Sequence, residues 1–510
     1  MLFNSYGFIF LFLPVTFFVF FVVGGRRAMH GAAWLTLASL FFYGWWNPVY
    51  VALLLASIVF NYGVGLLLAR ESPPAWMPGR RTLLAIGIGG DLLLLSYYKY
   101  ANFLLDTLNP LAGSSWSLGE IVLPLGISFF TFTQIAFLVD TYQGKVKEYS
   151  FIHFALFVTY FPHLIAGPVL HHKEMMPQFA DPRTYRRNYD HIAAGLTFFA
   201  IGLFKKAVLA DGIAPYANGS FAAAASGQPL SMFEAWGGAL AYTFQLYFDF
   251  SGYSDMAVGL SRLFGIRLPF NFDSPYKAAN IIEFWRRWHM TLSRFLRDYL
   301  YLPLGGNRKG KVRRYVNLMI TMLLGGLWHG AGWTFVIWGA LHGGYLIVNH
   351  AWHALRAAVG FPGPPSRFSR FAGCALTFVA VVVGWVFFRA PTVDQALAIL
   401  AGMAGLNGVS LPAGLAGYMG PVRPLAEGLG IAYALGSGTQ FVSTYLWVAA
   451  LSGIAFLLPN TQQFIDRHEP RLKNTLTWRP TRAWAIAIGA MFAAGVLTLS
   501  SVTEFLYFQF

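Results

Sequence analysis

Long apolar runs separated by short basic loops are the feature that most constrains the fold of this chain. Runs of about 20 residues, such as 3–24, 48–69 and 371–388, have the length that a helix needs to cross a bilayer. Helices suit this setting because lipid offers no hydrogen-bond partners to unpaired backbone groups. Only 11% of the 510 residues are charged, against about 25% in soluble proteins. We therefore predict an all-α polytopic integral membrane protein.

The apolar runs predict about eleven spanning helices plus re-entrant or interfacial helices, all within one domain of residues 1–510. The other expected helices cover residues 31–46, 82–97, 121–140, 191–211, 236–266, 331–352, 441–458 and 483–502. Residues 404–437, rich in Gly, Pro and Leu, are predicted to form an external or interfacial loop with short helices. Polar groups such as Asp249 and Asp255 lie among aromatic residues, which is typical of a helix that faces the interior of a bundle.

The Lys and Arg residues, which give the chain a net charge of +15, lie mainly in the loops between apolar runs. Basic loops tend to stay in the cytoplasm, so Arg26 and Arg27 after the first run predict an N-terminus on the outer side. The basic loop 467–482 likewise predicts an outer C-terminus. A nucleic-acid partner is not expected, because the sequence lacks a solvated basic face with phosphate-spaced contacts.

The apolar run 149–170 has basic residues, and hence predicted cytoplasmic loops, on both flanks. A single crossing cannot satisfy that arrangement. Pro162 and Pro168 interrupt the run near its end, because proline lacks the N–H that a helix interior uses. We therefore predict a re-entrant hairpin, which is tolerated only where protein or water covers the backbone.

The stretch 283–344 sets a basic segment directly before an apolar segment that contains histidine. Residues 315–344 have no Asp, Glu, Lys or Arg, yet His329 lies among them in the tripeptide Trp-His-Gly. An ionisable side chain at membrane depth suggests a functional site, and a neutral imidazole can accept a proton from an attacking hydroxyl. His329 is therefore our candidate general base; the alternative is a histidine that only hydrogen-bonds between helices.

His289 lies in a second dense motif, FWRRWHMTLSRFLRDYL. Helical spacing puts Trp285, His289 and Leu292 on one stripe, with the arginines on other sides. This pattern fits either a second catalytic histidine or an interfacial amphipathic helix. The basic run Arg308 to Arg314 fits an anchor to anionic lipid and also a patch that attracts an anionic acyl carrier.

Other chemistries lack their sequence motifs. The pairs His171-His172 and His350-x-x-His353 have no HExxH arrangement or evident third carboxylate ligand, so we predict no metal site. No GxSxG elbow and no GxxxxGK[ST] loop occurs, which argues against a serine hydrolase and a P-loop ATPase.

Several of these blocks together resemble the membrane-bound O-acyltransferase (MBOAT) family, in particular its bacterial alginate O-acetylase-like branch. The blocks cover residues 124–142, 160–179, 247–276, 283–307 and 323–343. Their order and spacing are compatible with the family, and they define an expected catalytic core of about residues 120–345.

The resemblance implies a helix bundle with a funnel to a buried histidine, which corresponds to His329, while the family's other motif histidine corresponds to His289. It implies an acyltransferase of the bacterial inner membrane. Acetyl-CoA or another acyl thioester would serve as donor substrate, with no permanently bound cofactor. A periplasmic partner of the SGNH type would complete the O-acetylation of an exopolysaccharide such as alginate.

Related branches keep other acceptors open, namely cellulose or another polysaccharide, and D-alanyl transfer to teichoic acid. A different functional class is also open: intramembrane polar residues line the path of a polytopic transporter as well. Inverted repeats and paired broken helices would favour a transporter, and the sequence shows one candidate break.

Overall fold

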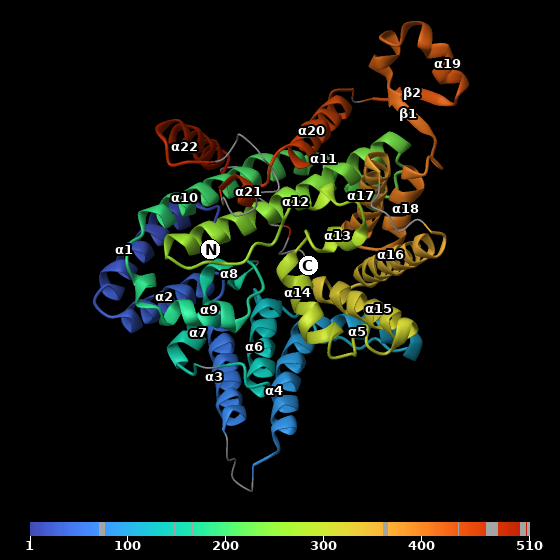
Figure 1. Cartoon of the computed structure of the whole chain (residues 1–510). Helices are drawn as coiled ribbons and strands as arrows, with labels where there is room; N and C mark the ends of the chain where they lie inside the picture. Colours follow the sequence, from blue (N-terminus) through green and yellow to red (C-terminus); the bar gives the residue numbers. More distant parts are fainter. Residues whose placement is uncertain are drawn as a thin grey trace.

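The computed structural model describes residues 1–70, 77–146, 148–165, 167–360, 366–436, 438–465, 478–499 and 506. Our expectation for the outer C-terminus and most of the predicted loop 467–482 lie outside the described residues. In the described part, helices dominate, as the apolar runs predicted. Figure 1 shows the whole chain, with the long helices of the central third crossing the middle of the molecule.

The first third of the chain supplies helices for one side of the bundle. They are η1 (Phe8–Phe12), α1 (Leu13–Gly24), α2 (Ala28–Gly44), α3 (Val49–Ala69), α4 (Arg80–Leu95), η2 (Ser96–Tyr100), α5 (Ala101–Ala112), α6 (Ile127–Tyr142), α7 (Phe151–Thr159), α8 (Phe161–Leu164), α9 (His172–Ala180) and η3 (Pro182–Tyr185). The predicted first five helices are all present. The span expected to begin at 121 starts six residues later, after a turn in which Gly126 adopts a positive φ of 69°.

The central third holds the longest helices and the motif-rich segment. Its helices are α10 (Tyr189–Phe204), η4 (Lys205–Ala210), α11 (Asp211–Ala225), α12 (Met232–Leu263), η5 (Pro275–Lys277), α13 (Ile281–Trp285), α14 (Met290–Leu296), η6 (Arg297–Tyr301), α15 (Gly310–His329) and α16 (Trp333–Ala358).

The last third adds α17 (Arg367–Arg389), α18 (Val393–Met403), η7 (Ala413–Gly417), η8 (Gly420–Val422), α19 (Arg423–Gly428), α20 (Gly438–Leu457), α21 (Thr461–Ile465) and α22 (Arg482–Leu497). The segment predicted to be a loop, 404–437, also contains β1 (Val409–Pro412) and β2 (Ile431–Leu435), which pair in parallel. The fold is therefore mainly helical rather than all-α. The predicted short helices are present there, and the module extends to one side of the bundle (Figure 1).

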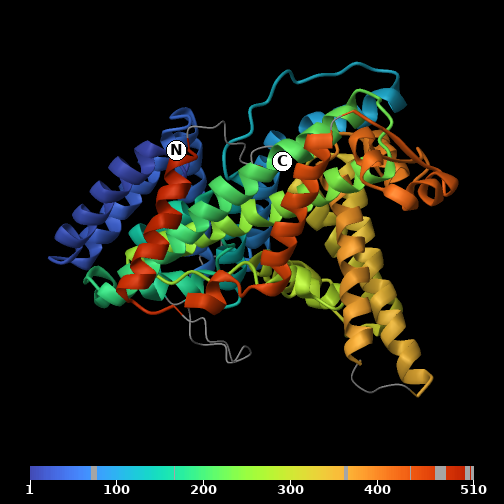
Figure 2. The ribbon, with the colours of Figure 1, turned by 90° about the horizontal axis from the view of Figure 1, so that it is seen from above.

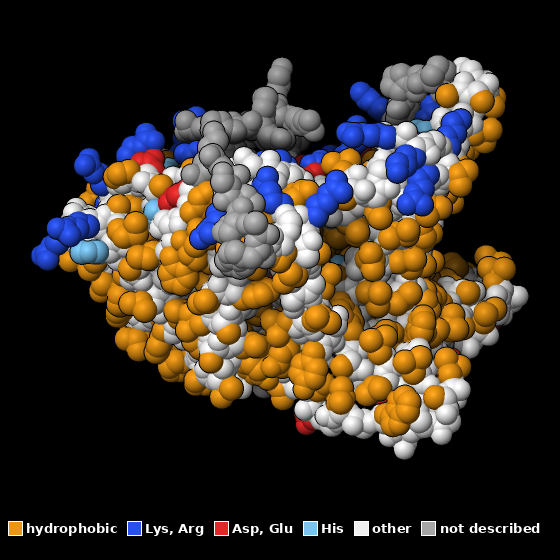
Figure 3. Space-filling view, turned by 90° about the horizontal axis from the view of Figure 1, so that it is seen from below, with side chains coloured by type: hydrophobic (Ala, Val, Ile, Leu, Met, Phe, Trp, Pro, Cys, Tyr) orange, Lys and Arg blue, Asp and Glu red, His pale blue; other side chains and the backbone are white. Residues whose placement is uncertain are grey.

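Four described helices are long and apolar enough to cross a membrane: Val49–Ala69, Tyr189–Ala225, Arg367–Arg389 and Gly438–Leu457. The number of about eleven spans stays a prediction. Figure 2 shows the helices from above, with the first helices on one side and α16 and α17 projecting from the other. Figure 3 shows Lys and Arg gathered along one edge, with a broad band of hydrophobic side chains beside it. This distribution is what a membrane protein with one basic face requires.

The helix predicted to end at 211 continues to Ala225 through the π-helical turn of η4. The sequence-based boundary was wrong because buried ion pairs neutralise the charges that suggested an end. Lys206 Nζ lies 2.7 Å from the Asp249 carboxylate on α12, and Lys205 lies 2.7 Å from Asp255. The polar residues of α12 thus face the interior of the bundle, as predicted.

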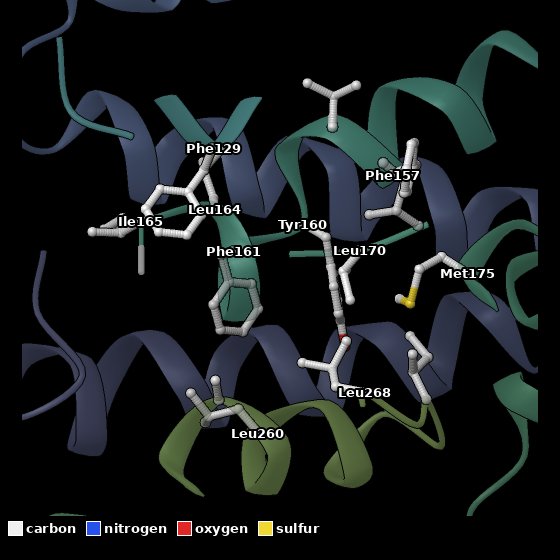
Figure 4. Packing of buried hydrophobic residues seen from close by; sticks show 14 of the residues in the cluster. Phe129, Phe157, Tyr160, Phe161, Leu164, Ile165, Leu170, Met175, Leu260 and Leu268 are labelled. Carbon is white, nitrogen blue, oxygen red and sulfur yellow. The ribbon is translucent and has the colours of Figure 1, made fainter. Parts of the chain in front are cut away.

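The run 149–170 is broken at the expected place. Helix α7 ends at Thr159, Tyr160 leaves helical geometry, and Pro162 lies in the first turn of the short α8. Protein covers this segment closely: Phe157, Tyr160 and Leu164 are buried with neighbours from other helices (Figure 4). The structure therefore provides the protein cover that a re-entrant backbone needs.

Buried side chains form two hydrophobic clusters. The first is built mainly from η1 to α10 and includes Trp328, while the second includes Trp288, Trp338 and Trp385. His329 follows Trp328 in sequence, and its ring lies 5.1 Å from that of Trp338. The histidine is therefore placed at the junction between the two clusters.

Candidate active site

Helices α15 and α16 approach each other closely because glycine faces the contact. A Cβ on Gly326 would lie 2.2 Å from the Phe335 carbonyl oxygen, and one on Gly339 would lie 2.4 Å from that of Met322. Real side chains do not fit at such distances. The glycines before and after the Trp-His-Gly tripeptide thus permit close packing of α15 against α16.

His329 is the last residue of α15, where the backbone leaves the helix at Gly330. Its side chain is surrounded by rings, with Trp328, Trp338 and Phe388 at 4.9, 5.1 and 5.1 Å between centroids. The residue is 7% exposed. His329 also lines a cavity.

His289 lies in the break between α13 and α14 and is fully buried. Its backbone has a positive φ of 41°, a conformation that non-glycine residues adopt rarely. The predicted continuous helical stripe through Trp285, His289 and Leu292 is therefore wrong. The helix ends at Trp285, and the arginine-rich motif turns so that His289 points inward rather than lying on a membrane surface.

The His289 ring is held by Asn271, whose Oδ1 lies 3.2 Å from Nδ1. Asn271 Oδ1 also accepts a hydrogen bond of 2.6 Å from Thr291. The other ring nitrogen, Nε2, has no hydrogen-bond partner among the described residues. Hence one ring nitrogen of His289 is fixed by the protein, and the other is buried without a described partner.

The structure brings the two predicted histidines together. The ring centroids of His289 and His329 lie 6.5 Å apart, although 40 positions separate them in the chain. Nothing in the local sequence motifs requires this proximity. It results from the sharp turn at His289 and the packing of α14 near the end of α15.

A cavity of about 200 Å³ opens on one side of His329. Its wall consists of Trp46, Lys99, residues 123–129, Ile165, Trp328 and His329. Gly126 shapes this wall, because a Cβ there would lie 2.5 Å from the Leu164 carbonyl oxygen. The loop before α6 can therefore lie against Leu164 at the end of α8. A smaller cavity of about 20 Å³, lined in part by Asp249 and Leu506, lies on another side of His329.

Lys99 is a site residue that the sequence analysis missed. In the sequence it follows the expected helix 82–97 and stands between tyrosines. Instead, Lys99 Nζ donates to the backbone carbonyls of Trp328 at 2.5 Å and His329 at 3.1 Å. Its place next to tyrosines gave no signal of this, because the contact joins segments about 230 residues apart.

His342, also in the apolar segment, is buried among aromatic rings from α13, α16 and α17. Both of its ring nitrogens lack a hydrogen-bond partner among the described residues. Its ring lies 4.7 Å from that of Trp338, which in turn contacts His329. The Trp338 ring therefore contacts the rings of both His342 and His329.

A separate polar cluster lies where α6, α9 and η6 meet. Asp140 accepts a hydrogen bond from Tyr299 at 3.0 Å, its Oδ2 lies 3.1 Å from His172 Nδ1, and the Tyr299 hydroxyl lies 3.1 Å from His171 Nδ1. The pair His171-His172 thus joins helices through Asp140 and Tyr299. No group of three or more His, Cys, Asp and Glu in the described ranges has the arrangement of a metal site.

The basic run is at the opposite end of α15 from His329. Arg308, Lys309, Lys311 and Arg313 are exposed, whereas Arg314 lies 2.8 Å from the His350 ring. A helix of this length spans roughly 28 Å at 1.5 Å per residue. The exposed positive charge and the candidate base are therefore about one membrane thickness apart.

Taken together, the site offers two neighbouring imidazoles, a lysine ammonium and a cavity in a largely aromatic environment. Such a set can accept a proton from a hydroxyl group and supply positive charge to a developing oxyanion. It contains no nucleophilic serine or cysteine within the cavity wall apart from Ser128. Direct transfer assisted by a base is the chemistry that this arrangement suits.

The MBOAT family model, described as the membrane-bound O-acyltransferase family, matches residues 103–390. A peptidoglycan O-acetyltransferase from Helicobacter pylori is 48% identical over 81% of this chain and 81% of its own length. A probable alginate O-acetylase AlgI from Pseudomonas putida is 40% identical over the whole of both chains.

A teichoic acid D-alanyltransferase from Streptococcus thermophilus is 29% identical over 52% of this chain and 68% of its own length. The matched region contains both histidines and most of the cavity wall described above, whereas Trp46 and Lys99 precede it. The end of α15 lies within the matched region, and this chain belongs to the membrane-bound O-acyltransferase family.

Proposed function

We propose that this protein moves an acetyl group from a cytoplasmic thioester donor across the inner membrane for the O-acetylation of a polysaccharide. The observation that carries this proposal is the location of His329 and its cavity at the far end of α15 from an exposed basic run. One helix thereby links a face suited to an anionic donor with a base suited to a hydroxyl acceptor.

The positions of the basic residues support an outer location for the cavity. Three helices contribute to the cavity wall or adjoin it. In each of them, the basic residues lie at the end of the helix that is farther from the cavity. Helix α2 follows Arg27 and leads to Trp46, α6 runs from the cavity toward Lys145, and α15 starts beside Lys309. Because basic loops remain cytoplasmic, the cavity opens to the periplasmic side in this proposal.

The termini fit the same orientation. The Tyr6 hydroxyl donates a 3.0 Å hydrogen bond to the carbonyl oxygen of Val496, near the end of α22. The start of the first helix and the end of α22 therefore lie together, whereas Arg26 and Arg482 lie at the opposite ends of these helices. We accordingly propose periplasmic termini in the bacterial inner membrane, with about eleven spans around a funnel to His329.

In the proposed reaction, His329 accepts the proton of the acceptor hydroxyl as its oxygen attacks the acyl carbon. The imidazole suits this role because its ordinary pKa lies near neutrality. His289, whose Nε2 faces no described partner, would orient the substrate or polarise the acyl carbonyl. The donor is acetyl-CoA or another acyl thioester and acts as a substrate, not as a permanently bound cofactor.

An exopolysaccharide such as alginate is the acceptor we propose, with a periplasmic SGNH-type protein as the partner that completes the modification. The match to an alginate O-acetylase over the entire length of both chains supports this choice. Peptidoglycan is a second candidate, supported by the 48% identity to a peptidoglycan O-acetyltransferase. Cellulose or D-alanyl transfer to teichoic acid would use the same base.

Sealed right-side-out vesicles test the direction of transfer. Labelled acetyl-CoA is enclosed in the vesicles, and alginate oligosaccharide together with the periplasmic partner is supplied outside. We expect label in the outer polymer with the wild-type protein and none with His329→Ala. Absence of outer label from vesicles whose protein is active in detergent would contradict transfer across the membrane. Replacing alginate with peptidoglycan distinguishes the two acceptors.

A further inference from the structure

Lys99 connects the end of η2 with the end of α15, and it does so directly at the candidate base. Its two hydrogen bonds go to the carbonyls of Trp328 and His329. The last carbonyls of a helix have no partner within the helix and carry partial negative charge, so an ammonium group stabilises them. Tyr100 adds a third contact to the same turn, donating a 2.8 Å hydrogen bond to the Leu327 carbonyl.

Helix termination alone does not account for a lysine at this location. In the part of the chain that the structure describes, Lys99 has no carboxylate within ion-pair distance, unlike the buried Lys206. An ammonium group is costly to remove from water without such a partner. A hydroxyl group such as that of Tyr100 can satisfy a helix carbonyl without this cost. The positive charge itself therefore calls for an explanation.

The cavity supplies that explanation. Lys99 and His329 both line the cavity of about 200 Å³, and Lys99 is the one Lys or Arg in its described wall. An ammonium group has three N–H donors. Two are used by the carbonyls of Trp328 and His329, which leaves the third for a group in the cavity.

We propose that Lys99 is a further residue of the reaction centre, whose ammonium both fixes the end of α15 beneath His329 and donates its third N–H to the oxyanion formed in the cavity. This inference rests on the proposed acyl transfer. In that reaction the acceptor oxygen bonds to the acyl carbon, its proton moves to His329, and the carbonyl electron pair moves onto the carbonyl oxygen.

Lys99 would hold that oxygen while it is negatively charged. When the carbonyl re-forms, the carbon–sulfur bond breaks and the thiolate takes the proton from His329. No oxidant or further reactant is needed, and both residues return to their starting protonation states. A donor aimed at the developing oxyanion typically changes kcat by about 10²- to 10³-fold, because it acts on the transition state more than on bound substrate.

Lys99→Gln is the decisive variant. A glutamine amide can still donate hydrogen bonds to the Trp328 and His329 carbonyls, so a purely structural role is preserved while the charge is lost. We expect kcat to fall about 10²-fold or more, with the KM for acetyl-CoA changed less than threefold and the thermal stability close to wild type. Lys99→Arg, which keeps the charge, should recover part of the lost kcat.

Tyr100→Phe serves as the matched structural variant, because it removes one contact to the same helical turn without altering charge. The fold decrease in kcat for Tyr100→Phe should be at least ten times smaller than the fold decrease for Lys99→Gln. If Lys99→Gln keeps the wild-type kcat, or if its loss matches that of Tyr100→Phe, the inference is wrong. The wild-type protein is measured in the same vesicle assay with acetyl-CoA, alginate oligosaccharide and the periplasmic partner. Its activity establishes the proposed function separately, whatever the result for Lys99.

Discussion

The rings of His289 and His329 lie 6.5 Å apart at the meeting point of α14 and α15. One is fixed by Asn271 from a preceding loop, and the other borders a cavity at the end of its helix. At this separation the two imidazoles are near neighbours within the buried site. The two histidines therefore form the centre of the candidate site.

His329→Ala should abolish acyl transfer while leaving the protein inserted and folded. Loss of a general base typically lowers a rate by about 10² to 10⁴. The comparison is His353→Ala, which removes an exposed histidine from α16 and should leave transfer unchanged. O-acetyl content of the polymer in cells, measured alongside the amount of membrane-inserted protein, provides the test. A His329→Ala strain with wild-type acetylation would show that this histidine is not the base.

His289→Gly removes the second imidazole without forcing an L side chain into the positive φ of this position. We expect transfer to fall by roughly 10- to 100-fold, less than for His329→Ala, because the base remains. Asn271→Ala should cause a smaller loss, since it frees His289 Nδ1 but keeps the ring. The measurement is the rate of acyl transfer by the purified variants. A normal rate for His289→Gly would show that the motif around His289 serves only in packing.

Replacing Arg308, Lys309, Lys311, Arg313 and Arg314 with Gln should raise the apparent KM for the thioester more than it lowers kcat. These charges attract an anionic donor over a Debye length of about 10 Å, so the difference from wild type should shrink in high salt. A variant that retains Arg314 excludes effects of losing its contact with His350. Changing the exposed Arg367 and Arg370 in the same way is the control. An unaltered KM would assign the run to membrane topology alone.

Gly339→Ala should destabilise the protein by about 1–3 kcal/mol, because the new Cβ would lie 2.4 Å from the Met322 carbonyl oxygen and force α15 and α16 apart. Activity should fall with stability, since His329 ends α15. Gly344→Ala on the same helix meets no atom within 4 Å and should be neutral or slightly stabilising. Thermal unfolding in detergent measures both. Equal stability of the two variants would contradict the close packing.

Lys206→Met should be strongly destabilising, by about 3–5 kcal/mol, because it leaves the Asp249 carboxylate buried without its ammonium partner. Adding Asp249→Asn should recover much of that loss. Arg423→Met, which breaks an exposed pair with Glu427, should have no measurable effect. Chemical unfolding of the three variants measures these losses of stability. If Lys206→Met alone loses as much stability as the double variant with Asp249→Asn, the two side chains are not coupled.

Much of the architecture could be predicted from local sequence. Length and hydropathy located α1 to α4 and the later spans, and proline at 162 located the break between α7 and α8. Predictions failed where the outcome depended on distant partners. Lys205 and Lys206 suggested a helix end, but carboxylates on α12 neutralise both, so the helix continues.

The sequence by itself determined that this chain is a helical membrane protein with one basic face, and that His329 is an ionisable group within an apolar segment. These properties follow from composition and spacing along a single helix, because a bilayer selects for length, hydropathy and charge.

Only the tertiary structure decided that His289 turns inward toward His329 and that Lys99 caps the helix which carries the candidate base. Both results depend on backbone geometry and on contacts between segments far apart in the chain: φ of 41° at His289, Asn271 beside its ring, and Lys99 at the carbonyls of α15. Side-chain periodicity describes one element at a time. It carries no information on which element will lie against it, and the candidate site is made entirely of such contacts.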